Sequence, residues 1–169
     1  MLINSADLIG SPEPNGNRGF GRVHLKAGMP FDGRDDMALF VADALKTELA
    51  ENTTDEYHFE MVSGKELELR VTLAWIDPPV TAESAAQLIN DLDLTVVGPD
   101  RSTEYKMFSG RVDNSNVIER VIVPADTVSE SSGTWTVTVS SSGLIMGTQP
   151  YSLVVTGPID EGSGAKPTH

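Results

Sequence analysis

The stretch "ELELRVTLAW", from Glu66 to Trp75, decides the fold class. Apolar and polar residues alternate along it, and a period of two is the pattern of a β-strand with one face in a core. The opposite face carries glutamate, arginine and threonine. We therefore predict a half-buried strand, whose apolar face is formed by Leu67, Leu69, Val71, Leu73 and Trp75.

The same alternation recurs along the chain, in "INDLDLTVV" (89–97) and in "GTWTVTVSS" (133–141). Three more candidate strands are "YHFEMV", "NVIERVIVP" and "YSLVVTG", each bounded by Gly, Pro, Ser or Asn. "DMALFVADAL" (36–45) fits a helix or a strand equally well on pattern alone. Short alternating strands at this spacing predict an all-β domain over residues 36–157, an antiparallel jelly-roll or β-sandwich barrel.

The two ends of the chain differ from this interior. Residues 1–10 fit a short helix, and "SPEPNGNRGFG" (11–21) then breaks it with prolines and glycines. We expect residues 1–31 to form a short helical and loop appendage. The last segment, 158–169, is polar and rich in glycine and proline, which predicts a flexible tail.

Composition excludes several classes of function. The chain has 169 residues, a formal net charge of −13 and no cysteine. The absence of cysteine excludes disulfides, thiol catalysis and thiolate zinc sites. The negative charge repels nucleic acid and anionic membranes, so we expect neither as a partner, and it favours uptake of cations.

No motif of nucleophilic catalysis is present. A serine hydrolase needs a nucleophile on a tight turn, a histidine base and an orienting acid. The sequence lacks G-x-S-x-G, and its only histidines are His24, His58 and His169. His58 lies in an alternating segment that predicts an ordinary exposed strand position. We expect no catalytic residue in this chain.

Acidic residues give the strongest sign of a site. Asp91 and Asp93 lie two apart in a predicted strand, so both carboxylates leave the same face roughly 7 Å apart. Two charges at that distance repel by about 2 kcal/mol at an effective dielectric near 20. The loop "RVDNSNVIER" adds Asp113, Asn116 and Glu119.

Two interpretations of these acids stay open from the residues alone. Calcium takes six to eight oxygen ligands, and carboxylates and amides supply them. The candidate ligands are Asp91, Asp93, Asp113, Asn116 and Glu119. Alternatively, Asp91 and Asp93 accept hydrogen bonds from backbone donors at a rim, or face a neighbouring domain. For Asp77 and Asp100, capping or turn roles are favoured over a metal.

Several motifs together resemble one family. "LINSAD" (2–7) and "PNGNRGFGRVHL" (14–25) are similar to the end of the catalytic domain of subtilisin-like serine proteases. The segments that follow, in order, resemble the C-terminal jelly-roll barrel of oxidatively stable alkaline proteases of that family. They are "LRVTLAWIDPP", "LINDLDLTVVGPD", "DNSNVIERVIVP", "GTWTVTV" and "QPYSLVVTG".

The resemblance implies a non-catalytic C-terminal accessory domain of a secreted serine endopeptidase. It places the catalytic motifs upstream of residue 1, makes residues 1–31 the end of the catalytic domain, and favours calcium at Asp91 and Asp93. The expected partners are the protease domain and its protein substrate. We also expect residues 1–31 to dock on the barrel or be mobile, with an exposed apolar patch.

A second function is a free-standing jelly-roll module that binds carbohydrate or a cell surface. Such modules use exposed aromatic side chains. Trp75 and Trp135 fall in phase with core positions, so we expect both to be buried. Tyr105 and Phe108 are the better candidates for an exposed pair.

Overall fold

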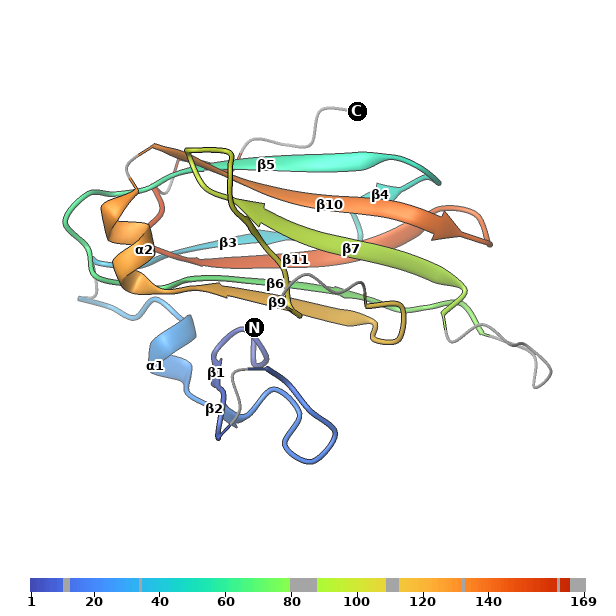
Figure 1. The fold of residues 1–169 in the computed structure, drawn as a ribbon, viewed down its shortest axis with the longest axis horizontal. Helices are drawn as coiled ribbons and strands as arrows, with labels where there is room; N and C mark the ends of the chain where they lie inside the picture. The colour runs from blue at the N-terminus through green and yellow to red at the C-terminus, as the bar shows by residue number, and fades with distance from the viewer. Residues whose placement is uncertain are drawn as a thin grey trace.

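Two antiparallel sheets lie face to face in the computed structural model (Figure 1). The prediction of an all-β fold is confirmed. The structure describes residues 1–10, 13–33, 35–79, 88–108, 113–131, 133–160 and 162–164.

The four-stranded sheet has the order β5-β10-β7-β8, and the five-stranded sheet has the order β3-β11-β6-β9, with β4 also paired to β11. The first sheet consists of β5 (Thr54–Glu60), β10 (Thr134–Leu144), β7 (Asn90–Val97) and β8 (Glu104–Tyr105). The second consists of β3 (Ala38–Ala42), β11 (Gln149–Gly157), β6 (Leu69–Trp75), β9 (Ile118–Val123) and β4 (Glu48–Leu49).

The core lies between the sheets and follows the alternation of the sequence. Trp75 and Trp135 are both buried in it, as predicted. Burying a large apolar side chain stabilises the fold by about 1.5–3 kcal/mol, so this paired set of inner faces is the main source of stability. It includes Leu69, Val71 and Leu73 of β6, Leu92, Leu94 and Val96 of β7, and Val137 and Val139 of β10.

The sheets do not close into a barrel, so that part of the expectation is wrong. No backbone ladder joins a strand of one sheet to a strand of the other among the described residues. Side chains and the chain end fill the two open sides instead. On one side Glu119 of β9 reaches β7, and on the other Ile159, within the predicted tail, is buried beside β5.

The N-terminal segment lies against the outer face of the five-stranded sheet (Figure 1). It contains β1 (Ala6–Asp7), β2 (Arg22–Val23) and α1 (Leu25–Gly28); the other helix of the described chain is α2 (Ala125–Glu130). The helix expected over residues 1–10 is therefore wrong, because only a tight turn precedes β1.

A glycine lets β1 and the following loop approach closely. Gly21 has a φ of +97°, and a Cβ there would lie 2.0 Å from the carbonyl oxygen of Asp7. Any larger residue would clash with the β1 backbone, which gives the "GFG" run of the sequence a packing role.

Candidate functional site

Asp91 and Asp93 project from the outer face of β7, as the sequence predicted. Along β7, buried and half-buried residues alternate, and both aspartates are half-buried. This part of β7 pairs with β10, while β8 pairs only with the far end, at Val96 and Val97. The two carboxylates therefore stand beside a stretch of β7 that has no strand on its second side within the described chain.

Glu119 fills part of that gap from β9. Its side chain is on the inner side of β9 and is only 4% exposed. Oε2 accepts a hydrogen bond of 2.6 Å from the backbone N–H of Leu94 on β7. A buried strand N–H must find an acceptor, and here a carboxyl group from the opposite sheet supplies it.

Asp113 and Asn116 close the loop that leads into β9. Asp113 is buried, and its Oδ1 accepts from the backbone N–H of Ser115 at 3.1 Å. The Asn116 amide donates to Oδ1 at 3.0 Å and to Oδ2 at 2.7 Å. Asn116 itself is exposed.

The acids lie close enough together to help raise the pKa of two of them, Asp91 and Glu119. Burial raises the pKa of Asp91 to about 6, and the charges of Asp93, Asp113 and Asp77 add to the effect. Burial also raises the pKa of Glu119 to about 8; the hydrogen bond from Leu94 opposes the rise, and Asp93, Asp113 and Asp91 reinforce it. The structure thus brings together Asp91, Asp93, Asp113 and Glu119, with Asp77 beside Asp91. We call these five residues the acidic edge.

One feature of the acidic edge favours a bound metal ion, and another does not. Oδ1 of Asp91 is buried without a hydrogen-bond partner in the described chain, and a cation would satisfy it. However, no group of three or more histidine, aspartate or glutamate side chains in that same part is arranged to hold a metal. The negative charge is gathered, but a coordination shell is not formed, so calcium here stays a prediction.

Acids other than Asp91 accept the hydrogen bonds from backbone N–H groups near this site and in the neighbouring turns. Asp77 accepts from the N–H groups of Ile89 at 2.9 Å and Asn90 at 2.7 Å, which confirms its predicted capping role. Asp100 accepts from the N–H of Ser102 at 3.2 Å, which confirms a turn role. The rim-capping alternative was stated for Asp91 and Asp93, but the acids that cap backbone donors here are Asp77 and Glu119. The buried Oδ1 of Asp91 has no hydrogen-bond partner in the described residues.

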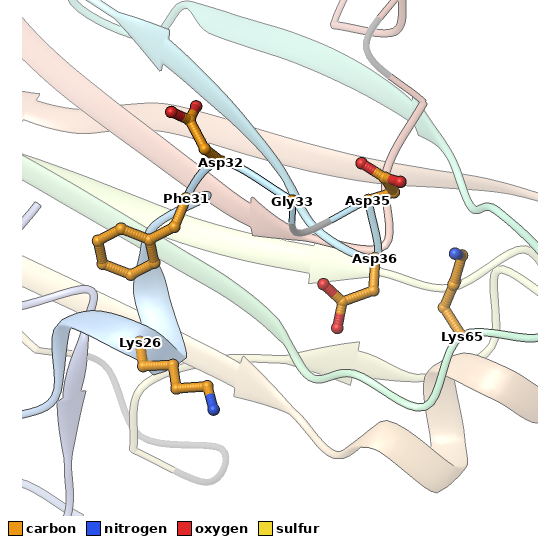
Figure 2. A pocket seen from close by; sticks show the side chains of 7 residues that line it. All are labelled: Lys26, Phe31, Asp32, Gly33, Asp35, Asp36 and Lys65. Atoms are coloured by element: carbon orange, nitrogen blue, oxygen red, sulfur yellow. The ribbon is translucent and has the colours of Figure 1, made fainter.

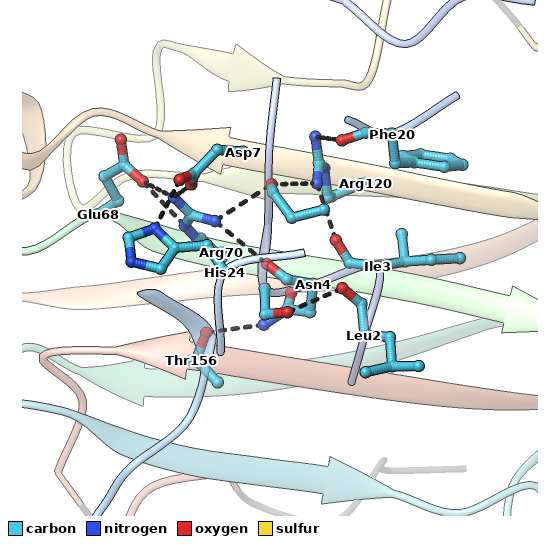
Figure 3. Close-up of polar contacts among 12 residues, drawn as sticks. Leu2, Ile3, Asn4, Asp7, Phe20, His24, Glu68, Arg70, Arg120 and Thr156 are labelled. Carbon is cyan, nitrogen blue, oxygen red and sulfur yellow. Dashed lines mark hydrogen bonds and ion pairs between the residues drawn. The ribbon is translucent and has the colours of Figure 1, made fainter. Parts of the chain in front are cut away.

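A second charged region, which the sequence did not predict, joins the N-terminal segment to the five-stranded sheet (Figure 3). Arg120 of β9 donates from Nη1 to the carbonyls of Ile3 at 2.8 Å and Ala6 at 2.7 Å. Arg70 of β6 donates to the carbonyl of Ala6 at 3.3 Å and to the Asp7 carboxylate at 2.9 Å. Both arginine side chains are buried by the segment that they hold.

Asn4 is the centre of the remaining contacts. It is fully buried; its Nδ2 donates to the hydroxyl of Thr156 at 2.7 Å, and its Oδ1 accepts from Thr72 at 2.9 Å. Both polar atoms of this side chain therefore have a partner on the sheet. We call the contact surface of Asn4, Asp7, Arg70, Arg120 and Thr156 the junction.

Opposite charges meet in the junction. Burial alone would raise the pKa of Asp7, but hydrogen bonds and charge from Arg70 and His24 outweigh it and hold the pKa below its usual value. His24 Nδ1 lies 2.6 Å from Asp7 Oδ2, and Glu68 lies 2.7 Å from Arg70 Nη2. Burial, and then the neighbouring Arg70, lower the pKa of Arg120 to about 10, so it stays charged at neutral pH.

A broad depression lies between Lys65 and the described residues of the stretch that leads from α1 to β3 (Figure 2). Its walls carry Asp32, Asp35 and Asp36 together with Lys26 and the exposed ring of Phe31. In Figure 2 the three carboxylates point in different directions instead of toward one point. These residues therefore form a charged surface and do not converge as metal ligands would.

The aromatic residues proposed for sugar binding do not form an open platform. Tyr105 is half-buried, and its ring packs 5.9 Å from that of Trp135, in a tilted arrangement. Phe108 is also half-buried. The exposed strand position of His58 is confirmed, since its side chain is 48% exposed and bonds to Thr136.

No family model matches the chain, and a comparison with curated proteins gave no match either. In the described part of the chain, no helix is long and apolar enough to cross a membrane.

Proposed function

We propose that this chain is the non-catalytic C-terminal accessory domain of a secreted subtilisin-like serine endopeptidase, built on a jelly-roll sandwich and stabilised by calcium. The proposal rests first on the sequence resemblance. The observation that supports it most is the N-terminal segment, which is tied to the sandwich by the polar junction while several of its apolar side chains face outward.

The exposed side chains of this segment have no cover in the described chain. Leu2 and Val23 are half exposed or more, and similar exposure is seen in Ile9, Leu25 and Phe31. A segment that buries its polar groups on one side and exposes large apolar groups on the other is typical of a surface between two domains. A preceding protease domain is the partner that fits it.

Calcium would be held at the acidic edge. Asp91, Asp93 and Asp113 would supply carboxylate oxygens, with Asn116 and Glu119 at the margin. Bound there, the ion would neutralise the gathered negative charge and stabilise the fold. The chain's own residues support this role, because Asp91 has a buried oxygen without a partner in the described chain and because the neighbouring acids help to raise its pKa.

The chain alone is expected to leave casein and peptide esters intact, because its sequence carries no motif of nucleophilic catalysis. Turnover that co-purifies with the protein and is blocked by serine-directed inhibitors would contradict this. The accessory role itself is tested by the gene sequence upstream of codon 1. A serine-protease reading frame joined to Met1 supports it, and a frame of another kind favours a free-standing binding module.

A further inference from the structure

The free edges of the two sheets are covered in different ways. An edge strand presents unpaired N–H and C=O groups that can pair with another chain, so stable proteins cover or interrupt such edges. The edge of β5 is covered by the end of the chain, where Val62 N–H donates to Pro158 at 2.7 Å and Asp160 N–H donates to Glu60 at 2.9 Å. Gly164 N–H donates to His58 at 2.9 Å further along.

The edges on the opposite side are covered by side chains. The Arg120 N–H of β9 contacts the sulfur of Met107 at 3.3 Å. The Leu94 N–H of β7 donates to Glu119, and β8 pairs with the far end of that edge. On the side of the sandwich formed by β7 and β9, therefore, the N–H groups of Leu94 and Arg120 both have partners.

The edge of β3 has no such cover in the described chain. Its five residues, Ala38–Ala42, pair with β11 on one side. On the other side, no backbone hydrogen bond to them is made by any described residue. The strand has the sequence Ala-Leu-Phe-Val-Ala, without the charge or proline that usually guards an edge.

The side chains of β3 add apolar surface to this edge. Leu39 is 37% exposed and Val41 is 51% exposed, both on the outer face. Phe40 points the other way, where its ring packs edge-on against Tyr57 at 5.5 Å and Phe59 at 5.3 Å. Gly164 of the chain end also lies against the Phe40 ring. These contacts fix the strand in place, while no described residue makes a backbone hydrogen bond to its outer edge.

Negative charge gathers where β3 begins. A hollow of about 290 Å³ at that end is lined by Asp35, Asp36, Val62 and Asp160, among others. The depression of Figure 2 shares Asp35 and Asp36 with it and also carries Lys26 and Lys65, so the excess of negative charge is on the side of Asp35 and Asp160. A strand that extends the sheet past Ala38 would bring its own next residues to these carboxylates.

We propose that the β3 edge binds an extended peptide segment of alternating apolar residues followed by lysine or arginine. The peptide adds an antiparallel strand to the five-stranded sheet, in which every existing ladder is also antiparallel. In that direction the residues after its apolar stretch lie beside Asp35 and Asp36. Backbone hydrogen bonds supply affinity, and the acidic hollow supplies preference for a basic end.

Charge argues against a second copy of this chain as the occupant. If two β3 strands paired antiparallel around Phe40, Met37 of one copy would face Asp43 of the other, with Asp36 next to it. At both ends of this paired strand, Asp36 of one copy would then lie near Asp43 of the other. This repulsion would arise between two chains that each carry a net charge of −13. A basic peptide removes this repulsion.

The probe is a synthetic peptide with threonine and valine alternating over five positions before two lysines, added to the full chain. We expect shifts in the amide NMR signals of residues 38–42, and slower exchange of the amides on the open edge. Two matched peptides separate the contributions. Glutamates in place of the lysines should weaken binding about tenfold, and backbone N-methylation at alternate positions should abolish it.

Variants of the chain locate the site. Leu39→Lys with Val41→Lys should abolish binding, whereas Leu45→Lys, 91% exposed just beyond β3, should leave it unchanged. Asp35→Asn with Asp36→Asn should remove the preference for lysine, and Glu130→Gln should not. The proposal is overturned if the lysine peptide binds no better than its methylated form, or shifts only signals outside β3. It is equally overturned if β3 proves to be covered by self-association that the peptide does not displace.

Discussion

The acidic edge and the junction both collect charged side chains at partly buried places, yet their electrostatics are opposite. In the junction, Arg70 and Arg120 face carbonyl groups and the Asp7 carboxylate, and the pKa of Asp7 falls. At the acidic edge the carboxylates lie near one another, and the pKa values of Asp91 and Glu119 rise. No ion pair in the described residues involves Asp91, Asp113 or Glu119.

This difference shows where the chain places its few basic side chains. With 25 acidic and only 12 basic residues, it places two arginines in the junction, while Asp91 and Glu119 are surrounded by other acids. Buried like charges are destabilising unless a counter-charge or a proton joins them. The junction is complete by itself, whereas the acidic edge is the place where an added cation would have the largest effect.

Removing an arginine from the junction should have the largest effect on stability. Arg120→Met keeps the apolar stem but leaves the carbonyls of Ile3 and Ala6 without this donor. We expect the free energy of unfolding to fall by about 3 kcal/mol, in line with breaking a buried charged contact. Urea unfolding measures the loss, and amide exchange should show residues 2–7 losing protection first.

Arg22→Met is the control for this change, because Arg22 lies in the same segment on β2 and is exposed. It should alter stability by less than about 0.5 kcal/mol. An Arg120→Met protein as stable as the wild type, with an equally protected segment, would show that the junction is a loose contact.

A pH change should alter the free energy of unfolding through the acidic edge, by less than the loss of Arg120 does. Folded Asp91 and Glu119 keep protons that the unfolded chain has already lost, since their pKa values rise to about 6 and about 8. Unfolding then releases protons, so without added cation stability should fall as pH rises from about 4 to about 8. We expect a loss of about 2 kcal/mol between pH 5 and pH 8, because water screens part of the repulsion at half-exposed Asp91.

Glu119→Gln isolates the source of this slope. The amide oxygen can still accept from the Leu94 N–H, but the side chain no longer titrates. The variant should lose most of the pH dependence and be at least as stable as wild type at pH 8. A wild-type stability that rises over this range, or a variant with an unchanged slope, would contradict the raised pKa values of Asp91 and Glu119.

The sequence predicted which strand residues are buried, but it predicted only some of the charged contacts. Alternation placed Leu69, Val71 and Leu73 in the core, because a strand with period two has few other ways to bury apolar side chains. It also placed Asp91 and Asp93 on one face of β7. Both results follow from local geometry alone.

The remaining features depend on which strands become neighbours. Arg70 and Arg120 occupy outward positions that look solvent-exposed in sequence, and only the docked N-terminal segment buries them. Glu119 meets Leu94 because β9 and β7 form one side of the sandwich. For Arg70, Arg120 and Glu119, the sequence shows only a charged residue within an apolar strand. Many solvent-facing strand positions show the same pattern, so it does not predict these contacts.

Calcium addition is the direct test of cation uptake by the acidic edge. Extracellular modules bind calcium at about 10⁻⁴ to 10⁻³ M, so millimolar calcium should stabilise the wild type by about 1 kcal/mol over chelator. Asp93→Asn should lose most of that gain without making the calcium-free protein less stable, because one repulsion is removed. Asp100→Asn, in a separate turn, should keep the full response. A wild type that melts at the same temperature in calcium and in chelator would contradict a calcium site at the acidic edge.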